Sequence, residues 1–457
     1  MHAIEEKLNE SPATRIHQYA FQYGVAFPEM LVGTADLGPD APRECVIGGE
    51  NLDDLEGAVR RLFGTSIRKP ISRDALQALI DVLKPTTEVA KYQLRSHLLD
   101  QEREMVRLVE NQYQVMDQLR RHRKAVIAGC AGSGKTLLAM EKARRLANEG
   151  FDVLLTCYNK RLAGWMRTSL DRDSGAASGR IRVNHYHELA DQLCKQAGLP
   201  LTFPTAPAEF NEFFQTTMPE AFFAALPKVP VRFDAIVVDE GQDFADTWWI
   251  TLNELLRDSD DGVFYIFHDE AQRLYQRESS FPFDVLPIEL THNLRNTRRI
   301  HDQVVRYHHG DVTPIADGPD GQKPEIVPLK AGDQVEDVLA RVVTRLVDEQ
   351  SIDPRDITVL TPRSQGRSTL PEGLPMGTKP WTLTWTDNAS ARSIQISTIH
   401  SWKGLESPIV IIAETDGLRS HHLGDALCYV ALSRAKHHLI VIGELPTPRP
   451  TAATALA

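Results

Sequence analysis

Residues 129–136 read Gly129-Cys130-Ala131-Gly132-Ser133-Gly134-Lys135-Thr136, the pattern G-x-x-x-x-G-K-T. An apolar run, 125–128, precedes it and a helix-forming run, 137–143, follows. This order predicts a strand, a phosphate-binding loop and a helix, which an accidental glycine turn would lack. The loop N–H groups can turn inward towards phosphate, and the helix N-terminus adds positive potential. Lys135 would reach the β- and γ-phosphates and Thr136 would ligate Mg²⁺, while the cradle would consist of Gly129, Ala131, Gly132, Ser133 and Gly134.

A second apolar stretch, 233–238, ends in Asp239-Glu240-Gly241-Gln242-Asp243. A buried strand that ends in carboxylates can supply the other half of an ATPase site. We predict that Asp239 holds the hydration shell of Mg²⁺ and that Glu240 polarises the attacking water. Gln242 would contact the γ-phosphate. An acidic surface turn would not follow so apolar a strand.

Strands and helices alternate through this part of the chain. The runs 152–157 and 181–187 both read as a strand followed by a helix, which predicts a parallel sheet with ligands at the strand ends. Polar and aromatic groups follow these strands, among them Tyr158, Asn159 and His185. Such groups suit backbone contacts and base stacking on a single nucleic-acid strand. Without the phosphate loop they would read as ordinary loop residues.

Composition narrows the class of protein. The chain has 457 residues, enough for two or three domains, and a net charge of −11 argues against a nucleic-acid coat protein. Five scattered cysteines predict neither a disulfide framework nor a zinc site, and they favour a reducing compartment. The charged start lacks a signal-peptide core, and no apolar run approaches the roughly 20 residues of a membrane span. We therefore expect a cytoplasmic protein that does not enter a membrane.

The motif order extends beyond these two sites. Asp269 to Tyr275 reads D-x-x-Q-x-x-Y, and three further stretches follow at 290–295, 396–406 and 429–436. They read L-T-H-N-L-R, I-S-T-I-H-S-W-K-G-L-E and Y-V-A-L-S-R-A-K. Together with the phosphate loop and D-E-G-Q-D, the series resembles the superfamily 1 helicases of the UvrD/Rep type across about residues 108–445. The resemblance implies an α/β fold with two RecA-like P-loop NTPase domains, each built on a parallel sheet, and ATP with Mg²⁺ between them.

The resemblance also implies roles for matched positions. Gln112, which by itself reads as an exposed helix glutamine, becomes the adenine reader. Gln272 would couple the γ-phosphate to nucleic acid, Arg295 and Arg434 would act as arginine fingers, and Glu406 would contact the nucleotide. The strand contacts would comprise Thr398, His400 and Tyr275, in addition to Tyr158, Asn159 and His185.

Two departures from the family pattern are visible. Leu294 stands where the family has a tyrosine that stacks on adenine, and the duplex-gripping insertions look reduced or absent. We expect an N-terminal α/β accessory region at 1–107, motor domains at 108–290 and 291–445, and a disordered tail at 446–457. Residues 1–107 vaguely resemble the segment that joins a NERD-type nuclease-related domain to a helicase, but no nuclease core is evident.

The sequence therefore predicts an ATP-dependent translocase or helicase that moves on single-stranded nucleic acid. The resemblance favours DNA over RNA and 3′-to-5′ travel, and it is compatible with a protein partner such as a nuclease. The alternative is an ATPase switch, regulated by nucleic acid or by a partner, that does not unwind processively. A small-molecule kinase with a phosphate loop would not require two arginines from a second domain.

Overall fold

The computed structural model describes residues 119–172, 180–272, 281–310, 312–376, 381–386 and 393–449, together with 45–63, 98–105 and shorter pieces between 14 and 117. Gln112 and Tyr275 lie outside the described residues, as do residues 450–457. The chain forms two compact units, residues 1–90 and residues 91–457.

The described part of the first unit contains a small parallel strand pair that is followed by a helix. β1 (Val25–Phe27) pairs with β2 (Val46–Gly48), and the turn η2 (Gly49–Asp54) leads into α3 (Leu55–Phe63). Arg60 and Glu56 lie one helical turn apart on α3 and form an exposed ion pair at 2.7 Å, which stabilises the helix slightly.

The second unit contains a six-stranded parallel sheet with the order β5-β4-β6-β7-β3-β8. The predicted strands are present. Their bounds are β3 (Lys124–Gly129), β4 (Val153–Cys157), β5 (Ile181–His185), β6 (Ala235–Asp239), β7 (Val263–His268) and β8 (Ile288–Leu290). The phosphate-loop strand β3 lies between β7 and the edge strand β8, so the loop emerges at the carboxyl edge of the sheet between these two strands.

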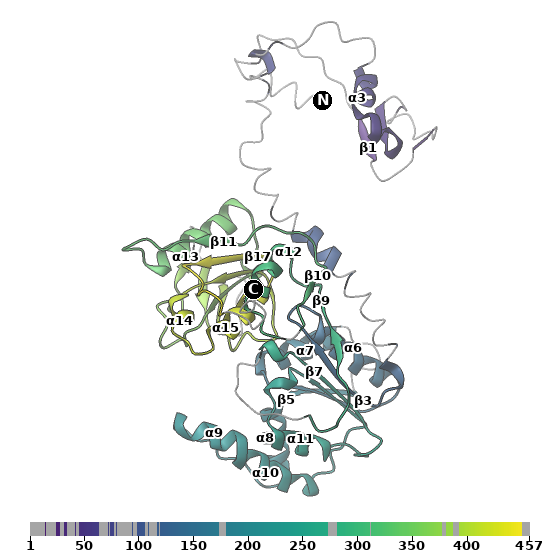
Figure 1. Ribbon diagram of the computed structural model, residues 1–457, viewed down its shortest axis with the longest axis vertical. Helices are drawn as coiled ribbons and strands as arrows, with labels where there is room; N and C mark the ends of the chain where they lie inside the picture. The colour runs from purple at the N-terminus through teal and green to yellow at the C-terminus, as the bar shows by residue number, and fades with distance from the viewer. Residues whose placement is uncertain are drawn as a thin grey trace. The chain divides into compact units, whose positions relative to one another are not determined.

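Helices cover both faces of this sheet (Figure 1). α6 (Lys135–Asn148) and α7 (Lys160–Arg172) pack on one face, while α8 (Tyr186–Gln196), α10 (Met218–Ala225) and α11 (Asp246–Asn253) cover the other. Successive side chains of β6 point to opposite faces of the sheet, and both faces are apolar. Val237 points into the first core and Val238 into the second, and both are fully buried. The helical segment 210–225 also contains α9 (Phe210–Glu212) and a π-helical turn, Phe213–Thr217.

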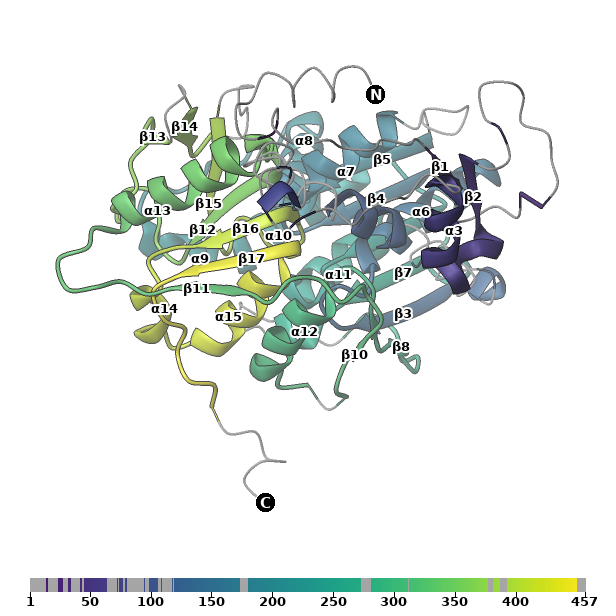
Figure 2. The same ribbon diagram turned by 90° about the horizontal axis from the view of Figure 1, so that it is seen from above.

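The other sheet of this unit has seven strands in the order β11-β17-β16-β12-β15-β14-β13, parallel except for β13 (Figure 2). The strands are β11 (Glu325–Val327), β12 (Ile357–Thr361), β13 (Pro375–Met376), β14 (Trp381–Thr384), β15 (Ser393–Thr398), β16 (Ser407–Ile412) and β17 (Ala435–Ile442). One face packs on α13 (Val335–Thr344), and the other packs on α12 (Arg298–Val304) and α15 (Gly424–Ser433). α14 (Asp416–Arg419) is a single turn before α15. The chain thus contains two RecA-like α/β layers, as the sequence predicts.

Short elements connect the two sheets. β9 (His292–Asn293) pairs in parallel with β10 (Ile315–Ala316), and α12 lies between them in sequence. Within the described residues, no helix is long and apolar enough to cross a membrane.

The segment before the phosphate-loop strand packs on the second sheet. Leu94 and Leu98 join the core beneath α13, and the Glu102 carboxylate pairs with Lys436 and with His437 at 2.8 Å. The structural division at residue 90 therefore differs from the sequence-based boundary at 107, because these long-range contacts leave no pattern in the sequence. The motor-domain boundaries remain a prediction.

The beginning of the expected tail is held in place. The Tyr307 hydroxyl donates to the carbonyl oxygen of Pro446 at 2.7 Å, and the Arg449 N–H donates to Asp425 at 3.0 Å. Residues 446–449 are therefore held by hydrogen bonds, in contrast to the expected disorder, because partners from the turn after α12 (Val305–Tyr307) and from α15 reach them.

Candidate nucleotide cleft and nucleic-acid interface

The phosphate loop connects β3 to α6 in the predicted way. Gly134 begins the helix with φ of 80°, and Gly132 has φ of 75°, a region that side chains disfavour. A Cβ on Gly132 would also collide with the side-chain oxygens of Asn293 and Asn296. Position 132 therefore requires glycine both for its backbone angle and for the close approach of the second domain.

Lys135 lies buried at the base of the loop. Its Nζ donates to the carbonyl oxygens of Gly129 and Cys130, each at 2.8 Å, and lies 3.4 Å from Asp269. Carbonyl oxygens are weaker partners for an ammonium group than phosphate oxygens. The loop thus holds the lysine in a position from which an arriving phosphate can take over its hydrogen bonds.

Asp239 is suited to a divalent cation. Both of its carboxylate oxygens are fully buried without a hydrogen-bond partner among the described residues. Burial and the neighbouring Glu240 raise the pKa of Asp239 to about 7, while Thr136 and Lys135 act in the opposite direction. A buried carboxylate without a partner is costly unless a cation compensates it. Asp239 and the Thr136 hydroxyl therefore fit the predicted Mg²⁺ site.

Glu240 lies directly after β6 in a left-handed conformation, with φ of 55°. Burial acts to raise the pKa of its carboxyl group, but the charges of Lys403, Lys135 and Arg434 outweigh it and bring the pKa below its ordinary value. Glu240 is therefore ionised, as a group that polarises water must be.

Gln242 lies behind Glu240, away from the cleft lining. Its amide donates to the Glu240 carboxylate, and its oxygen accepts the Asp269 N–H at 3.0 Å. Both ends of the amide are thus used within the first domain, and the contact of Gln242 with a γ-phosphate stays a prediction.

Two arginines from the second domain reach the cleft. Arg295 forms an ion pair with Glu406, and Arg434 donates to the Gln272 side chain at 3.3 Å and to the Leu405 carbonyl oxygen at 3.4 Å. The cleft is a cavity of about 20 Å³, lined by Gly132, Gly134, Lys135, Thr136, Glu240, Gln272, Arg295, Gly404, Glu406 and Arg434. Most of the predicted nucleotide residues therefore converge, although they are far apart in sequence.

Leu294 contacts the phosphate loop through its backbone. Its N–H donates to the Gly132 carbonyl oxygen at 3.0 Å, and its side chain is buried. An aliphatic side chain can pack against a base but offers no aromatic face for stacking.

A larger cavity of about 330 Å³ lies between polar groups of both domains. It is lined by Tyr158, Asn159, Lys160, Arg161, His185, His187, Asp243, His400, Ser401 and Lys403. Four of the predicted strand contacts therefore gather here. Thr398 does not line it, and its hydroxyl donates to Ser401 at 2.9 Å.

Two of these strand residues have specific local roles. The Asn159 amide donates to the carbonyl oxygens of Ser401 and Lys403, at 3.1 and 3.0 Å, and so bridges the domains. Burial, followed by the neighbouring His421 and Lys403, lowers the pKa of His400 to about 4. His400 is consequently neutral at pH 7 and would contact a strand by hydrogen bonding or stacking.

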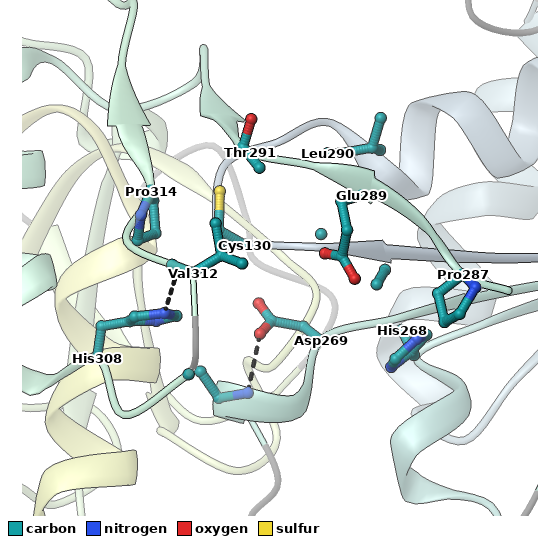
Figure 3. A pocket seen from close by; sticks show the side chains of 14 residues that line it. Cys130, His268, Asp269, Pro287, Glu289, Leu290, Thr291, His308, Val312 and Pro314 are labelled. Carbon is teal, nitrogen blue, oxygen red and sulfur yellow. Dashed lines mark hydrogen bonds between the residues drawn. The ribbon is translucent and has the colours of Figure 1, made fainter. Parts of the chain in front are cut away.

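A third cavity, of about 160 Å³, adjoins the phosphate loop and shares no lining residue with the cleft (Figure 3). Cys130, Asp269 and Leu290 of the first domain face it, opposite His308, Val312 and Pro314. Burial raises the pKa of the Cys130 thiol to about 12, so this cysteine is unreactive at pH 7.

Sequence reasoning missed several residues of these sites. Lys403, Asp243 and Asp269 all take part in buried ion pairs at the cleft, and all three lie within or beside the quoted motifs. Their signal was therefore present in the sequence. Tyr429, whose hydroxyl contacts the loop at Ala131, is likewise the first residue of a quoted motif, but the motif does not indicate this contact.

Comparisons with known proteins agree with the order of the sites. Residues 112–277 match the family model described as an AAA domain, and residues 393–442 match the model of the UvrD-like helicase C-terminal domain.

Similar solved structures include the helicase of PRRSV, at 14% identity and a TM-score of 0.35, covering 71% of this chain and 55% of that chain. The arterivirus nonstructural protein 10 helicase has 13% identity and a TM-score of 0.34, covering 70% and 59%. The chain thus spans less than two thirds of the length of either relative. The two matched domains, in this order along one chain, indicate a UvrD-like helicase of superfamily 1.

Proposed function

We propose that the protein hydrolyses ATP in the cleft and uses the cycle to move along single-stranded nucleic acid. One observation carries this proposal: the phosphate loop and Glu240 of the first domain share a cavity with Arg295, Glu406 and Arg434 of the second. A site divided between two domains changes when they separate. Hydrolysis at such a site can therefore be converted into relative motion of the domains.

Each residue has a distinct task in this proposal. Lys135 and the loop N–H groups would bind the phosphates of ATP, and Thr136 with Asp239 would hold Mg²⁺, which neutralises phosphate charge when bound. Glu240 would orient and polarise the attacking water. Arg434 would stabilise charge that develops on the transferred phosphoryl group.

The path of the strand is proposed to run through the 330 Å³ cavity. Lys403 supports a connection between the two sites because it lines that cavity and also lies 3.6 Å from Glu240. A strand that draws Lys403 away from Glu240 would raise the basicity of the carboxylate that polarises water. While Glu240 stays ionised, a more basic carboxylate polarises water more strongly, and this is the proposed route by which nucleic acid stimulates hydrolysis.

The test is ATP turnover by the full chain alone and with single-stranded DNA, single-stranded RNA or blunt duplex. A motor should be stimulated at least several-fold by one single strand, and DNA is the favoured substrate. Binding should weaken steeply with added salt, as phosphate contacts are replaced by ions. Duplexes with a 3′ or a 5′ tail would then determine polarity, for which 3′-to-5′ is expected.

Lys135→Ala serves as the inactive control in each assay. A turnover rate indifferent to every nucleic acid would instead favour the ATPase switch. The net charge of −11 is compatible with that alternative, since an acidic surface does not attract nucleic acid.

A further inference from the structure

Tyr429 joins the second domain to the phosphate loop by a buried hydrogen bond. Its hydroxyl oxygen accepts the backbone N–H of Ala131 at 2.9 Å. The Tyr429 side chain is fully buried, and Ala131 is only 2% exposed. Water therefore cannot replace the hydroxyl if it is removed, and the Ala131 N–H would lose its partner.

Tyr429 and Arg434 are held together by the same helix. Tyr429 lies on α15, which ends at Ser433, and Arg434 follows directly. Residues 427–433 of this helix are all buried, and the Arg434 guanidinium donates back to the Val430 carbonyl oxygen at 3.0 Å. The helix and the base of the arginine therefore move together, so a contact at Tyr429 restrains the position of Arg434.

The phosphate loop is not packed on all sides, so its position depends on contacts from the second domain. Cys130, next to Ala131, faces the 160 Å³ cavity instead of a packed core (Figure 3). The second domain holds the loop backbone through Leu294, which donates to Gly132, and through the Tyr429 hydroxyl. With open space beside Cys130, the loss of either hydrogen bond would allow the loop to shift.

We propose that Tyr429 is a positioning residue that aligns Arg434 with the phosphate loop through its hydrogen bond to Ala131. This inference rests on the proposed ATPase function. It assigns Tyr429 no contact with the nucleotide. Its effect should therefore be exerted on turnover through Arg434, with little effect on ATP binding.

The test compares Tyr429→Phe with Tyr307→Phe. Each variant removes one buried hydroxyl, and the Tyr307 hydroxyl bonds to Pro446, away from the cleft. Tyr429→Phe should reduce kcat by roughly 5- to 30-fold, the effect of one lost buried hydrogen bond, and leave KM for ATP within about two-fold. Tyr307→Phe should retain normal kcat. Equal kcat losses in the two variants would overturn the proposal.

Two further measurements keep the test decisive. When Arg434→Ala is already present, Tyr429→Phe should cause little additional loss of kcat, whereas an independent structural role would give additive losses. Amide exchange of the segment containing Ala131 should accelerate in Tyr429→Phe and remain normal in Tyr307→Phe. Unchanged exchange would contradict the restraint. If the wild-type protein has no ATPase activity, the proposed function fails, while the exchange experiment still tests the contact.

Discussion

The ammonium group of Lys403 in the second domain donates to both carboxylate oxygens of Asp243 in the first domain, each at 2.8 Å. Both side chains are almost completely buried, and the Glu240 carboxylate lies 3.6 Å from the same nitrogen. One lysine thus pairs with Asp243 and also lies close to Glu240 across the domain boundary. A buried ion pair of this kind is costly to break on one side, because the remaining charge loses its partner.

Replacing Lys403 should change how activity depends on pH. The charge of Lys403 is the largest influence that lowers the pKa of Glu240 against the effect of burial. In Lys403→Met the pKa of Glu240 should rise, so the acid side of the pH–rate profile should move to higher pH. The measurement is kcat between pH 5 and 9, where the variant should lose more activity at pH 6 than at pH 8.

Lys142→Met is the matched control for Lys403→Met. Lys142 is also buried, but its ammonium group lies over the Tyr265 ring at 4.2 Å and away from the cleft. Its replacement should leave the shape of the pH–rate profile unchanged. A profile for Lys403→Met that falls uniformly, without a shift of its acid side, would contradict the assigned electrostatic role.

Lys135→Ala should abolish ATP hydrolysis while the fold persists. Asp269, which loses the lysine, keeps hydrogen bonds from the Ala271 N–H and the Gln272 amide. The melting temperature should therefore stay within about 4 °C of wild type. Turnover and thermal melting on the same preparation check both parts, and retained turnover in a folded variant would show that phosphate is activated elsewhere.

Arg434→Ala should lower turnover by roughly 10³- to 10⁵-fold, the range for arginine fingers in phosphoryl transfer. ATP affinity should change only modestly, because the phosphate loop and Lys135 supply most of the binding. Arg434→Lys should restore little, since an ammonium group cannot reproduce the planar guanidinium geometry. Near-normal turnover per folded molecule in Arg434→Ala would mean that the arginine serves only its helix contacts.

The ion pairs of Glu102 should make stability depend on pH. Burial raises the pKa of this carboxyl group, but the hydrogen bond from His437 and the charge of Lys436 outweigh it and lower the pKa from 4.5 to about 2. The stabilisation is thus present above pH 4.5 and is lost as pH falls towards 2. Glu102→Gln should be less stable than wild type at pH 7, and the difference should shrink below pH 4.5.

The Glu102 prediction is checked by urea unfolding at several pH values, with Glu104→Gln as the control. Glu104 is an exposed neighbour on the same helical segment. Its replacement should not alter the free energy of unfolding by more than surface changes usually do, about 0.5 kcal/mol. A Glu102→Gln variant as stable as wild type at pH 7 would show that the contact with Lys436 and His437 contributes nothing.

The fold could largely be predicted because its strands are short apolar runs that end in polar groups. Residues 153–157 and 235–239 are fully buried strands, and both end at the functional edge. Strand order could not be predicted, since nothing in the sequence states that β3 lies between β7 and β8. The attachment of Leu94, Leu98 and Glu102 to the second sheet also depends on contacts over hundreds of residues.

The residues of the cleft could be predicted from the motifs, but their positions relative to one another could not. Lys135, Glu240 and Arg434 lie within recognisable patterns, and the structure brings them into one cavity. The position of Gln242 could not be predicted, because it depends on hydrogen bonds of its amide with the Glu240 carboxylate and the Asp269 N–H. The roles of all these residues in hydrolysis remain predictions.

The attachment of Glu102 to the second domain sets a limit on how far the cleft can open. Thirteen residues separate Met105 from Leu119, where the chain enters the first domain. A chain of this length cannot span more than about 50 Å even when it is fully extended. While Glu102 keeps its contacts with Lys436 and His437, the two domains can therefore separate only within the reach of this connection.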